Sequence, residues 1–286
     1  MTPPNTELSE AIRRQVRTAL DEDLTPAGDV TAEAIPADAW TGAWIVSRER
    51  GVIAGRPWVE AVFAALDERI TIDWSVEEGR RVQPNTLLCR LYGPARALVT
   101  GERTALNFLQ TLSATATLTR AYVDAVAGTD VAILDTRKTL PGLRSAQKYA
   151  VRCGGGTNHR MGLGDAVLIK ENHIAASGSI PESVTRVRHL HPELPMEVEV
   201  ESLNQLREAM DAGAERILLD NMDDDTLREA VTIAKGRVFL EASGNMDRER
   251  VGRVAQSGVD AISVGALTKD VRALDLSMGF DDLEDA

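Results

Sequence analysis

From Val131 onward the chain repeats one pattern: a short apolar run with β-branched residues, a polar or glycine-containing connection, and a stretch whose apolar residues have helical spacing. Strands that alternate with helices form a parallel sheet, because a parallel neighbour is reached only through a long crossover. The apolar runs, which we predict to be strands, cover residues 131–135, 166–170, 196–200, 216–220, 238–242 and 261–265. The sequence therefore predicts an α/β fold built on a parallel sheet.

The spacing of these runs bears on whether the sheet is open or curved into a barrel. Successive strand ends are 35, 29, 21, 21 and 24 residues apart, so each step accommodates one helix and one strand. This favours an incomplete or distorted (β/α) barrel over a doubly wound open sheet. Neither GxGxxG nor GxxxxGK[ST] occurs in the sequence, which further disfavours the doubly wound alternative.

The first part of the chain has a different pattern. Helical spacing at 8–21 and 102–126 flanks stretches with the Gly and Pro punctuation of hairpins. We expect an α+β domain over residues 1–130 that includes the long second helix, and the incomplete barrel over 131–270. A C-terminal tail over 271–286 can then pack back on the first domain.

Charge is unevenly distributed along the 286 residues. The chain has 32 Lys and Arg against 44 Asp and Glu, a net charge of −12, which argues against general binding to nucleic acid or to an anionic membrane. One segment is the exception, with Asp165 as its single acid. Its basic residues are Arg137, Lys138, Arg144, Lys148, Arg152, Arg160 and Lys170. We therefore expect a small polyanionic ligand, although Arg144 and Arg152 fall in a predicted helix and can equally form a solvated face.

The cysteine content and the N-terminal sequence bear on where in the cell the protein is located. Cys89 and Cys153 are far apart and no CxxC motif occurs, so neither a disulfide framework nor a cysteine zinc site is indicated. The first ten residues have no basic start followed by an apolar run, and no apolar stretch of about 20 residues occurs. We expect a cytoplasmic protein that neither spans nor binds a membrane.

Polar or small residues follow the apolar runs at their carboxyl ends. In parallel βα arrays these ends gather on one side, where ligands bind. For one strand, a charge that simply leaves the core for solvent is the better explanation, but a whole set of strands favours a binding site. The polar or small residues at these ends are Asp135, Thr136, Arg137, Lys138, Lys170, Glu171, Asn172, Glu199, Glu201, Asp220, Asn221, Glu241, Ser243, Gly244 and Gly265.

Acidic residues alternate in the predicted strand at 196–200. Glu197, Glu199 and Glu201 point to one side, and they cannot all share a dry interior, so at least one must reach solvent or a cation. With Asp220 one strand away, Glu199 can hold Mg²⁺ directly or through water. The alternative is an edge strand with solvated glutamates.

The loop before the second strand is rich in hydrogen-bond donors. Gly154, Gly155 and Gly156 either let backbone amides approach an anion or simply end a helix. Thr157, Asn158, His159 and Arg160 follow at once. A single histidine such as His159 is more often structural than catalytic.

Long segments of the chain resemble the quinolinate phosphoribosyltransferase family, also called nicotinate-nucleotide pyrophosphorylase (carboxylating). The segments are DTRKTLPGLRSAQKYAVRCGGGTNHRMGLGDAVLIKENH (135–173), EVEVES, LLDNM, LEASGN, ISVGALT and, nearer the N-terminus, DVTAEAIP, GVIAG and GERTALNFLQ. The resemblance covers nearly the whole chain.

The resemblance implies a reaction, a fold and an assembly. The family makes nicotinate mononucleotide from quinolinate and phosphoribosyl pyrophosphate (PRPP) with Mg²⁺, and releases pyrophosphate and carbon dioxide, in de novo NAD biosynthesis. Its fold is an α/β sandwich domain beside an incomplete α/β barrel. Members of the family form a homodimer in which each active site contains one arginine of the partner subunit. Arg103 occupies the place of this arginine in the motif GERTALNFLQ.

The resemblance also implies roles for individual residues. Arg137, His159, Arg160 and Lys170 are expected to contact the quinolinate carboxylates, and Lys138 to lie between substrate and pyrophosphate, beside Thr136. Glu199 and Asp220 are expected to serve the ribose and Mg²⁺. The 5′-phosphate is expected at Ser243, Gly244, Asn245 and Gly265.

Three other functions remain open from the sequence. A related phosphoribosyltransferase can use another base, although three arginines suit a dicarboxylate. A Schiff-base lyase can use Lys170 as its nucleophile. A non-catalytic anion-binding module is disfavoured by the paired Glu199 and Asp220.

Overall fold

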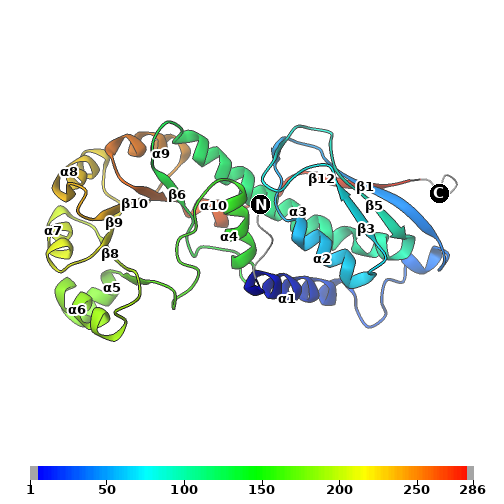
Figure 1. Cartoon of the computed structure of the whole chain (residues 1–286), viewed down its shortest axis with the longest axis horizontal. Helices are drawn as coiled ribbons and strands as arrows, with labels where there is room; N and C mark the ends of the chain where they lie inside the picture. The colour runs from blue at the N-terminus through cyan, green and yellow to red at the C-terminus, as the bar shows by residue number, and fades with distance from the viewer. Residues whose placement is uncertain (1–5, 282–286) are drawn as a thin grey trace. The chain divides into compact units, whose positions relative to one another are not determined.

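Figure 1 shows the computed structural model, which describes residues 6–281. Two compact units are present. Unit 1 contains residues 6–118, 140–155 and 270–281, and unit 2 contains residues 119–139 and 156–269. The division thus differs from the one expected near residue 130, because residues 140–155 belong to unit 1 rather than to the unit with the parallel sheet.

Unit 1 contains an antiparallel sheet with strand order β12-β1-β5-β3 and a two-stranded sheet of β2 and β4. Its elements are α1 (Thr6–Asp23), a 3₁₀ turn (Ala32–Ala34), β1 (Trp40–Ser47), β2 (Gly51–Val52), α2 (Arg56–Leu66), β3 (Thr71–Trp74), β4 (Arg81–Val82), β5 (Thr86–Pro94), α4 (Arg144–Cys153) and β12 (Leu276–Phe280). Alternate residues of β1 are buried, as expected of a sheet with one face on a core. The C-terminal strand β12 pairs with β1, and Ala43 lies opposite Phe280.

Helix α3 (Ala95–Ala125) begins seven residues before the predicted start at residue 102. The missed turns contain Gly101, which is unfavourable inside a helix. A Cβ atom at Gly101 would lie 2.7 Å from Phe63 Cε1 and 2.8 Å from Leu66 Cδ1. This glycine therefore permits close packing of α3 on α2, and tertiary contacts override the local preference.

Unit 2 contains six parallel strands in the order β6-β11-β10-β9-β8-β7. Its elements are β6 (Ala132–Leu134), β7 (Val167–Ile169), α5 (Glu171–Ser177), α6 (Ile180–Leu190), β8 (Met196–Val200), α7 (Leu203–Asp211), β9 (Arg216–Asp220), α8 (Asp224–Ala234), β10 (Phe239–Ser243), α9 (Arg248–Val254), a 3₁₀ turn (Ala255–Ser257), β11 (Ala261–Ser263) and α10 (Ala266–Lys269). No pairing closes β6 on β7 within residues 6–281, so the predicted incomplete barrel is confirmed. The edge-strand alternative for the glutamates is wrong, because β8 lies between β7 and β9.

The helices of unit 2 start at sequence-encoded caps. Ser179, Ser202, Asp223 and Asp247 each accept a hydrogen bond from the backbone N–H three residues later, at the starts of α6 to α9. Such caps satisfy one of the unpaired amides of the first turn. The strand ends are thereby fixed relative to the helices that follow them. No helix in the described part of the chain is long and apolar enough to cross a membrane.

A buried polar contact joins distant segments of unit 1. Trp58 is fully buried, and its indole Nε1 donates to Gln15 Oε1 at 2.9 Å. The Gln15 amide in turn donates to the Gly142 carbonyl at 2.8 Å and to Ser145 Oγ at 3.1 Å. Gln15 therefore connects α1, α2 and the segment that leads into α4.

The substitution Gln15→Leu tests this connection. It leaves the Trp58 indole N–H buried without its acceptor, and we expect a loss of about 1–3 kcal/mol in the free energy of unfolding. Urea unfolding monitored by tryptophan fluorescence measures the loss. Gln256→Leu is the matched control, because Gln256 is exposed. Equal midpoints for the two variants would show that the contact does not stabilise unit 1.

Candidate active site

The register of the six strands determines which side chains share the inner face of the unit 2 sheet. Glu197 lies opposite Leu168 and Arg216, Glu199 opposite Leu218, and Glu241 opposite Leu218 and Ala261. Paired residues point to the same side and alternate residues point to opposite sides. The polar residues that share this face are Lys170, Glu197, Glu199, Arg216, Asp220, Glu241, Ser243 and Ser263. The outer face is apolar, since Val198, Val200, Ile217, Leu219 and Leu240 are buried under the helices.

Lys170 and Glu199 form an ion pair at the carboxyl ends of β7 and β8. Lys170 Nζ donates to Glu199 Oε2. The Glu199 side chain is 9% exposed and that of Lys170 is 42% exposed. The pair therefore stands at the border between the interior and solvent, where a ligand can reach it.

A basic cavity of about 460 Å³ lies in unit 2 beside this pair. Arg137, Arg160 and Lys170 contribute to its lining. The pKa of Arg160 is lowered, first by partial burial and second by the like charge of Arg137. A ligand with negative charges relieves this repulsion, so the cavity fits an anion with more than one acidic group.

Three of the seven basic residues in the sequence cluster belong to unit 1. Arg144, Lys148 and Arg152 lie on α4 in unit 1, and Lys148 is fully buried there. The cluster thus divides between the units, and Arg137, Lys138, Arg160 and Lys170 are its unit 2 members.

Lys138 and Thr136 follow β6 and lie against the end of β11. A Cβ atom at Gly265 would lie 3.0 Å from Lys138 Cδ and 3.8 Å from Thr136 Oγ1. Thr136 Oγ1 accepts from the Lys138 backbone N–H at 3.1 Å, and Thr268 Oγ1 donates to the Lys138 carbonyl at 2.9 Å. Glycine at 265 therefore leaves room for the exposed lysine chain to cross the end of β11.

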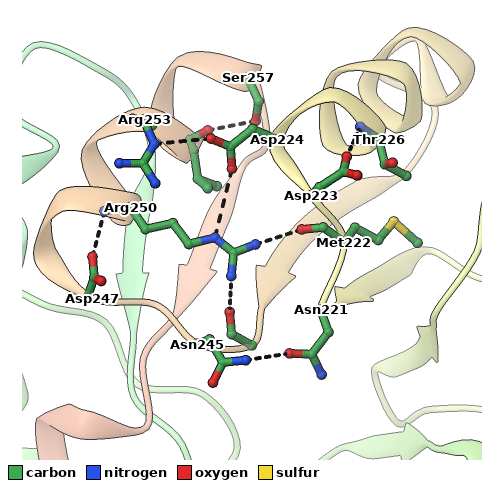
Figure 2. A network of polar contacts seen from close by, with 12 residues as sticks. Asn221, Met222, Asp223, Asp224, Thr226, Asn245, Asp247, Arg250, Arg253 and Ser257 are labelled. Atoms are coloured by element: carbon green, nitrogen blue, oxygen red, sulfur yellow. Dashed lines mark hydrogen bonds and ion pairs between the residues drawn. The ribbon is translucent and has the colours of Figure 1, made fainter.

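The ends of β9 and β10 form a second, polar corner, shown in Figure 2. Ser243 lies opposite Asp220, and the Asn221 backbone N–H donates to the Ser243 carbonyl at 3.0 Å. Gly244 has φ +95°, and a Cβ atom there would lie 2.2 Å from Asn221 Oδ1. Asn245 Nδ2 donates to the same Oδ1 atom at 3.3 Å. Only glycine fits at position 244 without displacing Asn221.

Arg250, on α9, holds the loops that follow β9 and β10 together. Its guanidinium donates to the Gly244 carbonyl at 2.8 Å and to the Met222 carbonyl at 2.7 Å, and Figure 2 shows that it bridges the two loops. Its Nε also lies 3.9 Å from Asp224 Oδ1. Sequence reasoning missed Arg250, because it lies on α9 and not at a strand end that the pattern marks, whereas Asn221 directly follows the last residue of β9.

Residues 157–159 run beside β6. The Thr157 N–H donates to the Ile133 carbonyl at 2.8 Å, and the Asp135 N–H donates to the Thr157 carbonyl at 3.2 Å. The buried Asp135 carboxylate accepts from the His159 backbone N–H at 2.9 Å and from Asn158 Nδ2 at 2.5 Å. This segment brings His159 and Arg160 to the unpaired side of β6.

His159 meets a buried acidic pair on the inner face. Its Nε2 lies 2.9 Å from Glu197 Oε2 and 3.5 Å from Glu241 Oε2. Arg216 is 3.7 Å from each of the two carboxylates, and its guanidinium stacks on the Phe239 ring at 3.9 Å. Burial, and then the neighbouring Glu197 charge, raise the pKa of Glu241 to about 7. Arg216 was not predicted, and its place in the strand is the only sequence signal for it, whereas Glu241 was noted only as a polar residue at the end of a predicted strand.

Arg103 lies in unit 1, on α3, and is exposed. It lines a cavity of about 490 Å³ within that unit, together with Arg14, Asn107 and Phe108. Arg103 is therefore accessible to a ligand or to another chain.

Glu199 and Asp220 present carboxylate oxygens on the same face of adjacent strands. Such hard oxygen donors fit Mg²⁺, which takes few carboxylates and keeps water or phosphate oxygens as its other ligands. Asp220 Oδ2 accepts from Asn221 Nδ2 at 2.7 Å, which orients this carboxylate. The donor set is thus compatible with the expected ion.

Family models match both parts of the chain. The quinolinate phosphoribosyl transferase C-terminal domain matches residues 115–279, and its N-terminal domain matches residues 29–113. The chain belongs to the quinolinate phosphoribosyltransferase family.

Individual relatives of the family agree over nearly the full length. The nicotinate-nucleotide pyrophosphorylase [carboxylating] of Mycobacterium leprae is 47% identical over 278 residues, which covers 94% of this chain and 97% of that protein. A quinolinate phosphoribosyltransferase [decarboxylating] of Nicotiana tabacum is 40% identical and covers 94% and 82%. The structure of the Francisella tularensis nicotinate-nucleotide pyrophosphorylase is similar with a TM-score of 0.93 at 44% identity, covering 96% of this chain and 97% of that one.

The raised pKa of Glu241 predicts a pH dependence of stability for this family member. Between its ordinary value of 4.5 and about 7, the folded protein keeps a proton on Glu241 that the unfolded chain has released, so stability falls as pH rises through this window. The charged or titratable side chains that face the Glu241 carboxyl are Glu197, His159 and Arg216. In Glu241→Gln the side chain cannot ionise, so we expect a smaller loss of stability between pH 5 and pH 8.

Urea midpoints at the two pH values measure the effect. Glu229→Gln, at a glutamate whose side chain is 59% exposed, serves as the control. The same pH dependence in wild type and Glu241→Gln would contradict the assignment.

Proposed function

We propose that the basic cavity and the polar corner of unit 2 bind the two substrates of a quinolinate phosphoribosyltransferase. The chain is an enzyme of this family: it transfers the phosphoribosyl group of PRPP to quinolinate with decarboxylation, a pentosyl transfer in de novo NAD biosynthesis. The observation that carries the placement is the cavity lined by Arg137, Arg160 and Lys170 beside Glu199.

Quinolinate is proposed to occupy the basic cavity. It has two adjacent carboxylates, and arginine guanidinium groups bind carboxylates through paired hydrogen bonds. The mutual repulsion of Arg137 and Arg160 favours binding of a dianion. Lys170 adds a third positive charge, so the charges of the substrate are matched without a compensating ion.

Glu199 and Asp220 are proposed to act at the ribose. Displacement at the anomeric carbon develops positive charge of oxocarbenium type, which neighbouring carboxylates stabilise electrostatically. Their common face beside the cavity would place them next to the reacting carbon. Lys170 holds the Glu199 side chain in place through their ion pair.

Lys138 is proposed to neutralise the departing pyrophosphate, with Thr136 beside it. The exposed Lys138 side chain passes over Gly265, and it can stay in contact with a phosphate group that leaves the site. Mg²⁺, held by Glu199 and Asp220, would supply further charge neutralisation for the phosphate oxygens. No covalent intermediate on the enzyme is required.

The corner of Ser243, Gly244, Asn245 and Gly265 is proposed to bind the 5′-phosphate. Glycines allow backbone amides to approach phosphate oxygens closely. The hydrogen bonds of Arg250 to the Gly244 and Met222 carbonyls would keep this corner rigid. The phosphate then fixes the ribose relative to Glu199 and Asp220.

Decarboxylation follows ribosylation of the pyridine nitrogen. The ring is then cationic, so loss of the adjacent carboxylate as carbon dioxide leaves a carbanion next to positive charge, and this carbanion takes a proton from water. The residues of the cavity need only orient that carboxylate and release it.

Two copies of the chain are proposed to form a homodimer in which Arg103 of each enters the site of the other. The exposure of Arg103 supports this role. A cytoplasmic location is proposed as well, since the buried Cys89 and Cys153 are not joined in a disulfide within residues 6–281.

A Schiff-base lyase is disfavoured by the environment of Lys170. A Schiff-base lysine is activated by desolvation or by a cationic neighbour. Lys170 is partly exposed and contacts a carboxylate instead. Borohydride treatment with substrate should therefore leave Lys170 unmodified, and formation of nicotinate mononucleotide from quinolinate, PRPP and Mg²⁺ tests the proposed reaction directly.

Arg137→Ala tests the quinolinate site. Loss of charged hydrogen bonds costs about 1.5–3 kcal/mol, and we expect an increase in quinolinate KM of about 10-fold to 100-fold with little change for PRPP. Steady-state kinetics with each substrate varied measures it. Arg17→Ala is the control, because the Arg17 side chain is 84% exposed on α1. Near-normal kinetics for Arg137→Ala would remove this residue from the site.

Mixed dimers test the exchange of Arg103. Arg103→Ala and Lys138→Ala homodimers should each be almost inactive. If Arg103 acts in the partner's site, a mixed dimer of the two variants has one site with both residues intact, and activity returns to about a quarter of wild type after statistical mixing. Refolding the two chains together and assaying nicotinate mononucleotide measures this. No recovery would indicate self-contained subunits.

A further inference from the structure

We infer that His159 is a positioning residue, held as a neutral imidazole between Glu197 and the Arg160 backbone, and that Glu197, Glu241 and Arg216 act with it to fix Arg160 for quinolinate. The inference rests on the proposed function. It differs from the direct contact between His159 and the substrate carboxylates that the family resemblance implies, and it gives roles to the buried Glu197 and Glu241 and to the half-buried Arg216, which the reaction itself does not use.

The hydrogen bonds of the ring define its protonation. Nδ1 accepts from the Arg160 backbone N–H at 2.7 Å, so Nδ1 carries no proton. Nε2 lies 2.9 Å from Glu197 Oε2, and a carboxylate accepts, so Nε2 carries the proton. Both nitrogens are thus engaged within the protein, and neither is left for a substrate carboxylate.

The charges around the ring are consistent with a neutral histidine. Arg216 lies 3.7 Å from both Glu197 and Glu241, and Glu197 also interacts with the charge of Arg160. The Glu241 side chain is fully buried, with Ser263 beside it. With a proton on Glu241, the Glu197 carboxylate faces these two guanidinium groups, so an imidazolium is not needed to balance it.

A metal ion is a competing explanation for these three groups, since the ligand atoms of His159, Glu197 and Glu241 lie within 4.8 Å of one another. The Arg216 guanidinium next to both carboxylates opposes a second cation there. A metal on Nε2 would also break the hydrogen bond with Glu197.

The network connects the interior of unit 2 to the basic cavity. Arg160 is fixed at its backbone N–H by the ring and at its guanidinium by the Ala166 carbonyl, 3.1 Å from Nη1. His159 is itself fixed through its own N–H by Asp135. Loss of the acceptor on Glu197 frees the ring, and the Arg160 backbone then loses its partner.

Substitutions at Glu197 distinguish positioning from direct contact. Glu197→Gln keeps an oxygen that accepts the Nε2 proton, whereas Glu197→Leu removes it. We expect quinolinate KM and the calorimetric quinolinate Kd to rise about 10-fold or more in Glu197→Leu, with PRPP KM unchanged, and to stay within about threefold of wild type in Glu197→Gln. Glu229→Leu, at an exposed glutamate on α8, is the matched control.

Imidazole ¹⁵N NMR of the wild-type enzyme reports the protonation without any change to the fold. The chain has four histidines, and His159→Gln assigns the His159 signals. We expect one protonated and one unprotonated nitrogen, unchanged in type when quinolinate binds. Two protonated nitrogens, or conversion to that form on binding, would overturn the inference.

Three further results would contradict either the role of His159 or the proposed function. Equal effects of Glu197→Gln and Glu197→Leu would show that the charge of Glu197 matters and not its acceptor oxygen, which contradicts a neutral imidazole. One tightly held metal ion per chain, found by elemental analysis and lost in Glu241→Gln, would replace the network by a metal site. Wild-type enzyme that neither binds nor turns over quinolinate would instead refute the proposed function, which separates the two failures.

Discussion

Side-chain alternation along parallel strands in register is the constraint on which the site of this protein depends. Because Glu197 pairs with Arg216 and Ser243 with Asp220, every second residue of neighbouring strands shares the inner face. A slip of one residue in a single strand would turn its carboxylates outward into the helix layer. The same register places the apolar residues of the strands under the helices, so packing of the outer face holds the inner face in place.

The inner face carries polar groups of two kinds, which differ in exposure and in chemistry. Lys170 and Glu199 are accessible to ligands at the carboxyl ends of β7 and β8, while Glu241, in register with Glu199 through Leu218, is fully buried. Buried charge is tolerated only when it is paired or neutralised. Arg216 and the raised pKa of Glu241 provide this neutralisation, which lets the interior hold polar groups that orient the residues above them.

Much of this arrangement could be predicted from local sequence, and the rest required the register. The strand positions follow from continuous apolar runs, and Arg137 and Lys170 were predicted as site residues because they follow such runs. Lys148 was grouped with them by proximity in sequence, but the helix that carries it belongs to unit 1, where it is buried. Glu241 meets His159, and Arg216 meets Glu241, only through strand order, and no local pattern encodes that order.

The open side of the sheet has a structural role of its own. In a closed barrel β6 and β7 would pair, but here residues 157–159 run beside β6 and hydrogen-bond with it instead. An irregular segment at this place can direct successive side chains differently from a strand. His159 thereby reaches Glu197 in the interior, while Arg160, the next residue, lines the basic cavity. The incompleteness of the barrel is therefore what allows one short segment to connect the buried acidic groups to the surface that binds anions.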